Sequence, residues 1–157
     1  MAEITQQDRD VFNNICGAFD DMDYSYEKNE EDLSVTCTAR GDDLPLEVHI
    51  FVHPEAKVVL LASPLPFEVS ESSRIDMAVA AAATTFKLIS GSFDFDLKDG
   101  HLYFRMTNSY RGSTISRKLF MDMFLVSCFT IDKYNEKLFM LSQGMLSLDK
   151  YLDTIND

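Results

Sequence analysis

The chain has 157 residues, of which 26 are acidic and 14 are basic, so its formal net charge is −12 at pH 7. Because 46% of the residues are apolar, the chain can bury a core, which excludes the class of acidic disordered proteins. The negative field repels phosphate groups, so we expect no nucleic acid and no membrane as partner. The length is typical of one domain, and we expect residues 1–157 to form one.

Nothing in the sequence predicts export or membrane insertion. The N-terminal residues MAEITQQDRD lack the basic and apolar regions of a signal peptide. The longest apolar run, residues 119–131, contains Asp122 and is shorter than the ~20 residues of a membrane helix. Cys16, Cys37 and Cys128 fit neither a disulfide framework nor a metal motif, so we expect reduced thiols and a cytoplasmic protein.

The first predicted element is an amphipathic helix. Apolar side chains recur at three- and four-residue spacings over residues 4–22, as they do along the buried face of a helix. Thr5, followed three residues later by Asp8, is typical of a helix start.

Three strands are predicted next. Apolar and polar residues alternate over residues 33–39 and 46–52, which indicates strands with one buried face, and Pro54 ends the second. Residues 58–62 predict a third, short strand. The prolines of residues 63–67 indicate a linker.

A second helix is predicted over residues 70–90, with Gly91 as its C-terminal stop. Its apolar stripe consists of Ile75, Val79, Ala82, Ala83, Phe86 and Ile89. The small side chains of residues 80–83 allow a close approach to another surface. We favour packing against the sheet and leave a helix-to-helix dimer contact open.

A β-hairpin is predicted over residues 92–106, because Asp99-Gly100 is typical of a two-residue turn. This turn places Asp94 opposite Arg105 and gathers the apolar side chains on the other face of the hairpin.

Two helices complete the chain. The first covers residues 116–143, ends at Gly144 and is apolar nearly all round in its first half, which indicates burial on more than one side. The second covers residues 146–155. No pattern of strand, helix and parallel strand appears, so the predicted class is α+β with an antiparallel sheet.

No residues with catalytic or metal-binding spacing stand out. His49 and His53 share one strand face but lie roughly 13 Å apart, too far for one metal ion. The carboxylates do not follow the spacing of a calcium loop, and no nucleophile or phosphate-binding motif is present. We therefore predict no catalytic residue, no metal ligand and no cofactor.

Two aromatic residues are candidates for partner binding. Phe51 and Tyr103 lie on strand faces that are otherwise polar, and Arg105 shares its face with Tyr103. We predict that these three residues bind a protein or peptide partner.

From Leu44 to Gly144 the chain resembles the YbjN family, small bacterial proteins related in fold to type III secretion chaperones. The resemblance is carried by LPLEVHIFVHP, LISGSFDFDLKDGHLYFRM and FTIDKYNEKLFMLSQG, and within them by Gly91, Phe93, Asp96, Asp99, Gly100 and Arg105. It implies an α-β-β-β-α-β-β-α chaperone-like sandwich, often dimeric. It also implies a role in sensory transduction or regulation, without catalytic residues.

Three functions remain open at this point. We prefer a non-enzymatic protein-binding or regulatory module that forms a homodimer. One alternative is a small-ligand receptor or enzyme with a carboxylate and histidine site. The other is an acidic inhibitor or immunity-type protein that covers a basic enzyme.

Overall fold

The computed structural model describes residues 3–157. Over these residues, six strands form one antiparallel sheet in the order β1-β2-β3-β4-β6-β5. The strands are β1 (Tyr26–Asn29), β2 (Ser34–Arg40), β3 (Pro45–His53), β4 (Val58–Glu68), β5 (Ser92–Asp96) and β6 (His101–Ser109). The helices are α1 (Gln6–Asp21), α2 (Arg74–Lys87), α3 (Arg117–Ser142) and α4 (Leu148–Asn156), with a short 3₁₀ turn, η1 (Glu71–Ser73), before α2. The predicted α+β class with an antiparallel sheet is confirmed.

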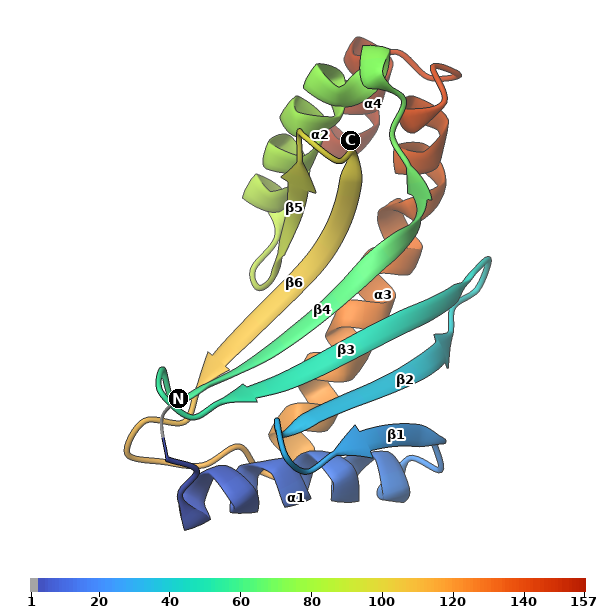
Figure 1. Ribbon diagram of the computed structural model, residues 1–157. Helices are drawn as coiled ribbons and strands as arrows, with labels where there is room; N and C mark the ends of the chain where they lie inside the picture. The colour runs from blue at the N-terminus through green and yellow to red at the C-terminus, as the bar shows by residue number, and fades with distance from the viewer. Residues whose placement is uncertain (1–2) are drawn as a thin grey trace.

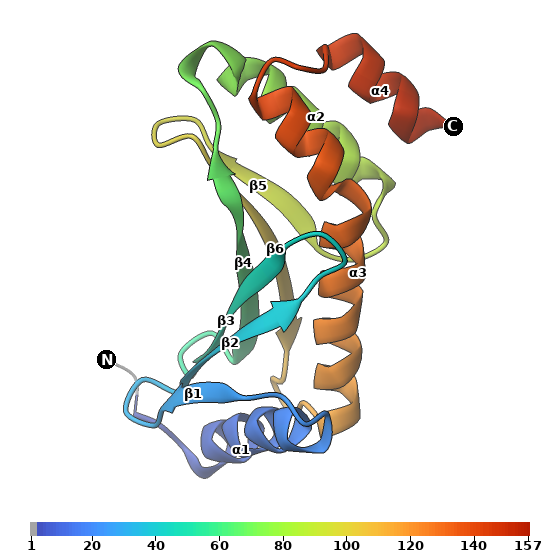
Figure 2. The same cartoon turned by 90° about the vertical axis from the view of Figure 1, so that its right-hand side faces the viewer.

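The helices lie on one face of the sheet and leave the other face uncovered (Figures 1 and 2). Buried residues alternate along β2, β3 and β6, because one face of each strand packs against the helices. The buried apolar side chains form a single cluster between the two layers. Relative to the predicted order of elements, β1 is an additional edge strand, and its mostly exposed residues give no alternating signal.

The first helix begins where the sequence predicts. Thr5 caps α1, and its side chain and that of Asp8 form a reciprocal capping box. Asp8 is fully buried, and its Oδ1 accepts hydrogen bonds from Lys57 Nζ at 2.8 Å and from the Tyr110 hydroxyl at 2.5 Å. Burial alone would raise the pKa of Asp8, but the bonds from Lys57, Thr5 and Tyr110 outweigh it and hold this pKa well below its ordinary value.

The strand predicted over residues 58–62 and the linker predicted over residues 63–67 are one continuous strand, β4. Its pairing with β3 ends at Ala62, and the half that contains Pro64 and Pro66 pairs with β6 alone. Proline has no N–H, so it is tolerated where a strand has lost a neighbour. The linker prediction is wrong because the sequence does not show where β3 stops.

The second helix is shorter than predicted. It ends at Lys87 and not at Gly91. Its predicted stripe does not face the core, because Ile75 is 68% and Phe86 is 86% exposed.

The buried face of α2 consists instead of Met77, Ala80, Ala81 and Thr84. Small side chains allow a close approach to β5, where the Thr85 hydroxyl accepts a hydrogen bond from the Phe93 N–H at 2.9 Å. Ala80 and Ala81 thus serve the packing that we favoured, whereas Ala82 and the larger apolar residues of the predicted stripe are exposed.

The turn of the hairpin has four residues, 97–100, and not two. The Asp96 carboxylate accepts hydrogen bonds from the N–H groups of Lys98 and Asp99, which stabilises the longer loop. Gly100 closes it with a φ of 76°, in the left-handed region.

The longer loop shifts the hairpin register by two residues from the predicted one. Ser92 opposes Arg105, and Asp94 opposes Tyr103. A shift by two keeps each side chain on its predicted face. Asp94 therefore still reaches Arg105, but diagonally.

The last two helices follow the prediction closely. The Ser116 side chain caps α3 by accepting a hydrogen bond from the Leu119 N–H at 3.1 Å. A buried 2.5 Å hydrogen bond between Thr84 and Tyr151 ties α4 to α2. Within residues 3–157, no helix has both the length and the apolar character needed to cross a membrane.

Candidate protein-binding surface

The uncovered sheet face carries apolar side chains on three neighbouring strands. Phe51 of β3 pairs with Leu60 of β4, and Ala62 of β4 pairs with Arg105 of β6. Tyr103 lies two residues from Arg105 on the same face. We call Phe51, Leu60, Ala62, Tyr103 and Arg105 the open-face patch.

Tyr103 and Arg105 line a hollow of about 560 Å³ on this face, together with Leu60 and Ala62. The Tyr103 side chain is 37% exposed. Arg105 Nε lies 2.6 Å from Asp94 Oδ2, and both side chains are partly exposed. Because both are partly exposed, the guanidinium and the carboxylate are accessible to a partner, and an exposed pair of this kind adds little to stability.

Phe51 lies outside this hollow. Its ring lies 6.5 Å from that of His49 and 6.1 Å from that of His53, centroid to centroid. Phe51 pairs through Leu60 with Thr107, four residues from Tyr103, or roughly 13 Å along the strand. The structure thus brings Tyr103 and Arg105 together and places Phe51 at the other end of the patch.

Leu60 and Ala62 are the patch residues that the sequence did not single out. Both lie in β4 between buried residues, Val59, Leu61 and Ser63. The sequence signal that could have identified them is an apolar side chain at a position that alternates with the buried positions of this strand.

Besides this patch, the groups of functional interest are the possible metal ligands and the thiols of the described residues. Among residues 3–157, no three His, Cys, Asp or Glu side chains are grouped so that they could hold a metal ion. All three cysteines are free. Burial raises the pKa of Cys37 to about 12 and that of Cys128 to about 11, so these thiols stay protonated near neutral pH.

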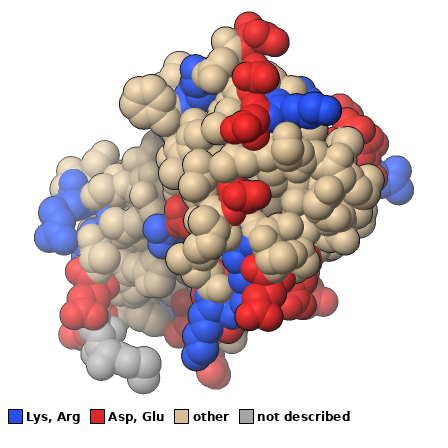
Figure 3. Space-filling view, turned by 90° about the horizontal axis from the view of Figure 1, so that it is seen from above, with Lys and Arg blue, Asp and Glu red and all other residues tan. Residues whose placement is uncertain are grey.

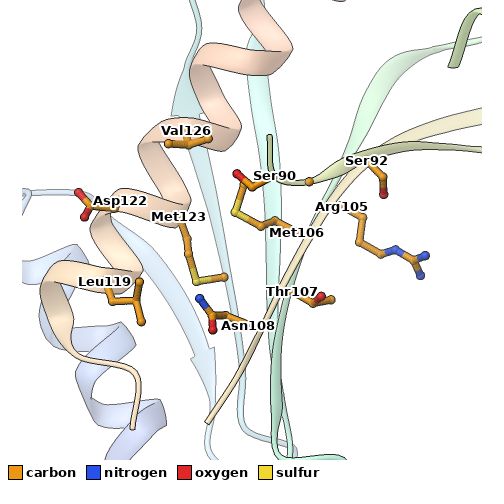
Figure 4. A pocket seen from close by; sticks show the side chains of 11 residues that line it. Ser90, Ser92, Arg105, Met106, Thr107, Asn108, Leu119, Asp122, Met123 and Val126 are labelled. Carbon is orange, nitrogen blue, oxygen red and sulfur yellow. The ribbon is translucent and has the colours of Figure 1, made fainter. Parts of the chain in front are cut away.

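A groove of about 660 Å³ lies on the helical side, between α3 and β6 (Figure 4). Met123 of α3 and Met106 of β6 extend into the space between these elements, and Arg105 points away from α3. Asp122 is the one carboxylate among its lining residues, which include neither histidine nor cysteine. The groove therefore does not offer the carboxylate and histidine site of the enzyme alternative.

The fold is similar to that of YbjN and of chains from type III secretion chaperone complexes. The chain is similar to YbjN from Escherichia coli, described with its structure as a candidate transcription regulator: the TM-score is 0.61 and the identity 14%, over 80% of this chain and 91% of that one. It is also similar to a chain of the ExoT–SpcS complex from Pseudomonas aeruginosa, with a TM-score of 0.54 and 11% identity over 82% of this chain and 98% of that one. A third similar structure is a chain of the HopA1–SchA chaperone–effector complex. Its TM-score is 0.50 and its identity 10%, over 91% of this chain and 98% of that one.

These identities establish a relation of fold alone. A scan against models of known families finds no match, and a sequence search of curated proteins finds none either.

Proposed function

We propose that the chain is a non-enzymatic module that binds a protein or peptide partner on the open face of its sheet. The observation that carries the proposal is the open-face patch, whose apolar side chains no helix covers. Two of the similar folds come from structures of complexes, one of them a chaperone with its effector, which supports a role in protein binding.

The patch has the composition of a binding hot spot. Tyrosine and arginine are enriched among the residues that contribute most to protein association. Tyr103 and Arg105 lie at the hollow, where a partner side chain can be enclosed. An apolar segment with an acidic residue fits this site, because the acid can bind the Arg105 guanidinium in exchange with Asp94.

Replacing Tyr103 by a photo-crosslinking phenylalanine derivative is expected to give one covalent adduct with a partner protein in irradiated cells. The reason is that a reactive ring at this site lies within the proposed interface. Denaturing gels and mass spectrometry of the purified adduct measure this result. The matched control places the same residue at Lys150, on the exposed surface of α4. Equal adducts from both positions, or none from position 103, would contradict the proposal.

The exposed face of α2 supports the homodimer expected from the sequence. Ile75, Val79, Ala82 and Phe86 follow one another at spacings of four, three and four residues, which is the pattern of a helix-to-helix seam. Seen from the end of the molecule that carries α2 and α4, uncharged surface lies between groups of acidic and basic side chains (Figure 3).

We propose that α2 of one copy packs antiparallel against α2 of a second copy. The seam is then self-complementary about a point between Val79 and Ala82, so that Ile75 opposes Phe86 and Val79 opposes Ala82 of the second copy. Asp76 in the first turn and Lys87 in the last turn of α2 lie at opposite ends of the helix. An antiparallel pair therefore places the acid of each copy near the base of the other.

Phe86→Asp is expected to raise the dissociation constant of the dimer about 100-fold, because a charge replaces the largest apolar side chain of the seam in both copies. Sedimentation equilibrium over a range of concentrations measures this constant. Phe129→Asp is the matched control, because Phe129 is 71% exposed but lies on α3. A wild-type chain that stays monomeric at high concentration would refute the homodimer and leave the partner-binding proposal standing.

A further inference from the structure

The sheet is forked where β3 and β4 separate. Pairing between them ends at His49 and Ala62, whereas β3 stays paired with β2 as far as Pro45. Beyond this point β4 continues beside β6, so β3 and β4 diverge (Figure 1). The buried Ser63 hydroxyl donates a 2.7 Å hydrogen bond to the Glu47 carbonyl across the base of the fork.

A cavity of about 290 Å³ lies at this fork on the side of α3. Its walls are apolar and include Leu44, Phe67 and Phe139. The rings of Phe67 and Phe139 meet edge to face at 5.6 Å between centroids. An aliphatic chain can lie against these rings without losing a hydrogen bond of its own.

Asn135 of α3 also lines the cavity, and its side chain has no partner. The residue is fully buried, and neither Nδ2 nor Oδ1 makes a hydrogen bond. A buried amide without hydrogen-bond partners lowers the stability of the fold. We therefore expect such an amide to have another role that offsets this destabilisation. The side chain offers a donor and an acceptor side by side, the arrangement that complements the N–H and C=O of one residue in an extended chain.

The rim of the cavity is acidic. Asp43 and Glu136 are lining residues, and both are exposed. Asp132 lies close by and accepts a 3.2 Å hydrogen bond from the Asp42 N–H. Burial raises the pKa of Asp132, and the carboxylates of Asp42 and Asp43 add to this effect. A cationic group is therefore favoured at this rim.

We propose that the cavity at the fork binds one lysine residue of an extended, basic peptide segment of the partner. The backbone N–H and C=O of that residue pair with the Asn135 amide. Its aliphatic stem lies against Phe67 and Phe139, and its ammonium group lies between Asp43 and Glu136. This inference rests on the proposed partner binding and adds a second site to it, on the helical side of the sheet.

The test uses the full chain and a capped peptide, acetyl-KLKLKL-amide. In an NMR titration, the signals of the Asn135 side-chain amide are expected to shift as the peptide is added. The acidic peptide acetyl-ELELEL-amide is expected to leave them unchanged. Shifts of equal size with both peptides would overturn the charge assignment.

Asn135→Leu separates the proposed role from a structural one. We expect binding of the basic peptide to weaken at least tenfold, while the midpoint of thermal unfolding rises by about 2–4 °C, because an unpaired buried amide has been removed. Asn13→Leu, on the exposed side of α1, is the matched control and is expected to leave peptide binding unchanged. Glu136→Gln, which leaves the buried residues in place, is expected to weaken binding severalfold and to reduce its salt dependence.

Unchanged peptide affinity in both Asn135→Leu and Glu136→Gln would overturn the site. A crystal structure in which Asn135 bonds only to an ordered water, with no peptide shifts at millimolar concentration, would do the same. Either result leaves the Tyr103 crosslink as an independent test of partner binding. Conversely, the crosslink can fail while the peptide still binds at the fork.

Discussion

Asp8→Asn is expected to lower the free energy of unfolding by about 3 kcal/mol, because it removes the charge that compensates the Lys57 ammonium. Asp8 is fully buried, and Lys57 Nζ lies 2.8 Å from it with only 21% of the lysine side chain exposed. The substitution also weakens the capping box with Thr5 and the bond from the Tyr110 hydroxyl. One residue therefore connects the start of α1 with the turn after β3 and the end of β6.

The same group predicts how stability depends on pH. Hydrogen bonds hold the Asp8 pKa well below its ordinary value in the folded chain, so the unfolded chain binds the proton first as the pH falls. The stability that Asp8 contributes is complete above pH ~4, the ordinary carboxyl pKa, and is lost progressively below it. This part of the acid sensitivity is expected to be absent in the Asp8→Asn chain.

Urea unfolding at several pH values measures both effects. Asp10→Asn is the matched control, because Asp10 lies on the same helix, is exposed and bonds only to the Gln6 side chain among the described residues. Adding Lys57→Met to Asp8→Asn is expected to recover part of the loss, since it removes the unpaired ammonium. A loss below 1 kcal/mol in Asp8→Asn would show that the buried pair is not stabilising.

Gly91→Ala is expected to cost about 3 kcal/mol, because it combines backbone strain with overpacking. Gly91 has a φ of 79°, in the left-handed region that side chains with a Cβ disfavour. A Cβ built there would lie 2.3 Å from Cζ of Phe104, which is fully buried. Either this buried ring or the start of β5 must therefore shift.

Gly112→Ala separates the two causes. Gly112 has a similar φ of 68°, but a Cβ there meets nothing within 4 Å. Its cost is expected to be about 1 kcal/mol, the backbone contribution alone. Denaturant unfolding of both variants measures the difference. Equal losses would contradict the steric role of Phe104.

Local signals sufficed for much of the fold. The cap at Thr5 and Asp8 is formed within four residues, and it occurs as predicted. The alternation that predicted the strands over residues 33–39 and 46–52 depends only on one buried face, and β2 and β3 follow it. The sequence likewise identified Phe51 and Tyr103 as side chains on the open face.

The errors arose where an element depends on its neighbours. Pro64 and Pro66 are compatible with a strand only because β3 no longer pairs with β4 there. The apolar stripe of α2 is regular in sequence but exposed, because the face that packs against β5 is the small one of Ala80 and Ala81. Asn135 gave no usable signal, since its lack of partners follows from a fork that no local pattern encodes.

The fork also bears on the speed of association. Because β3 and β4 are already apart beyond His49 and Ala62, an entering segment breaks no strand pairing and displaces no ladder hydrogen bond. Binding there needs no separation of strands, and the attraction of the acidic rim for a basic chain speeds the encounter. A partner of this kind would be captured quickly, and its residence time would then depend on how well it pairs with Asn135.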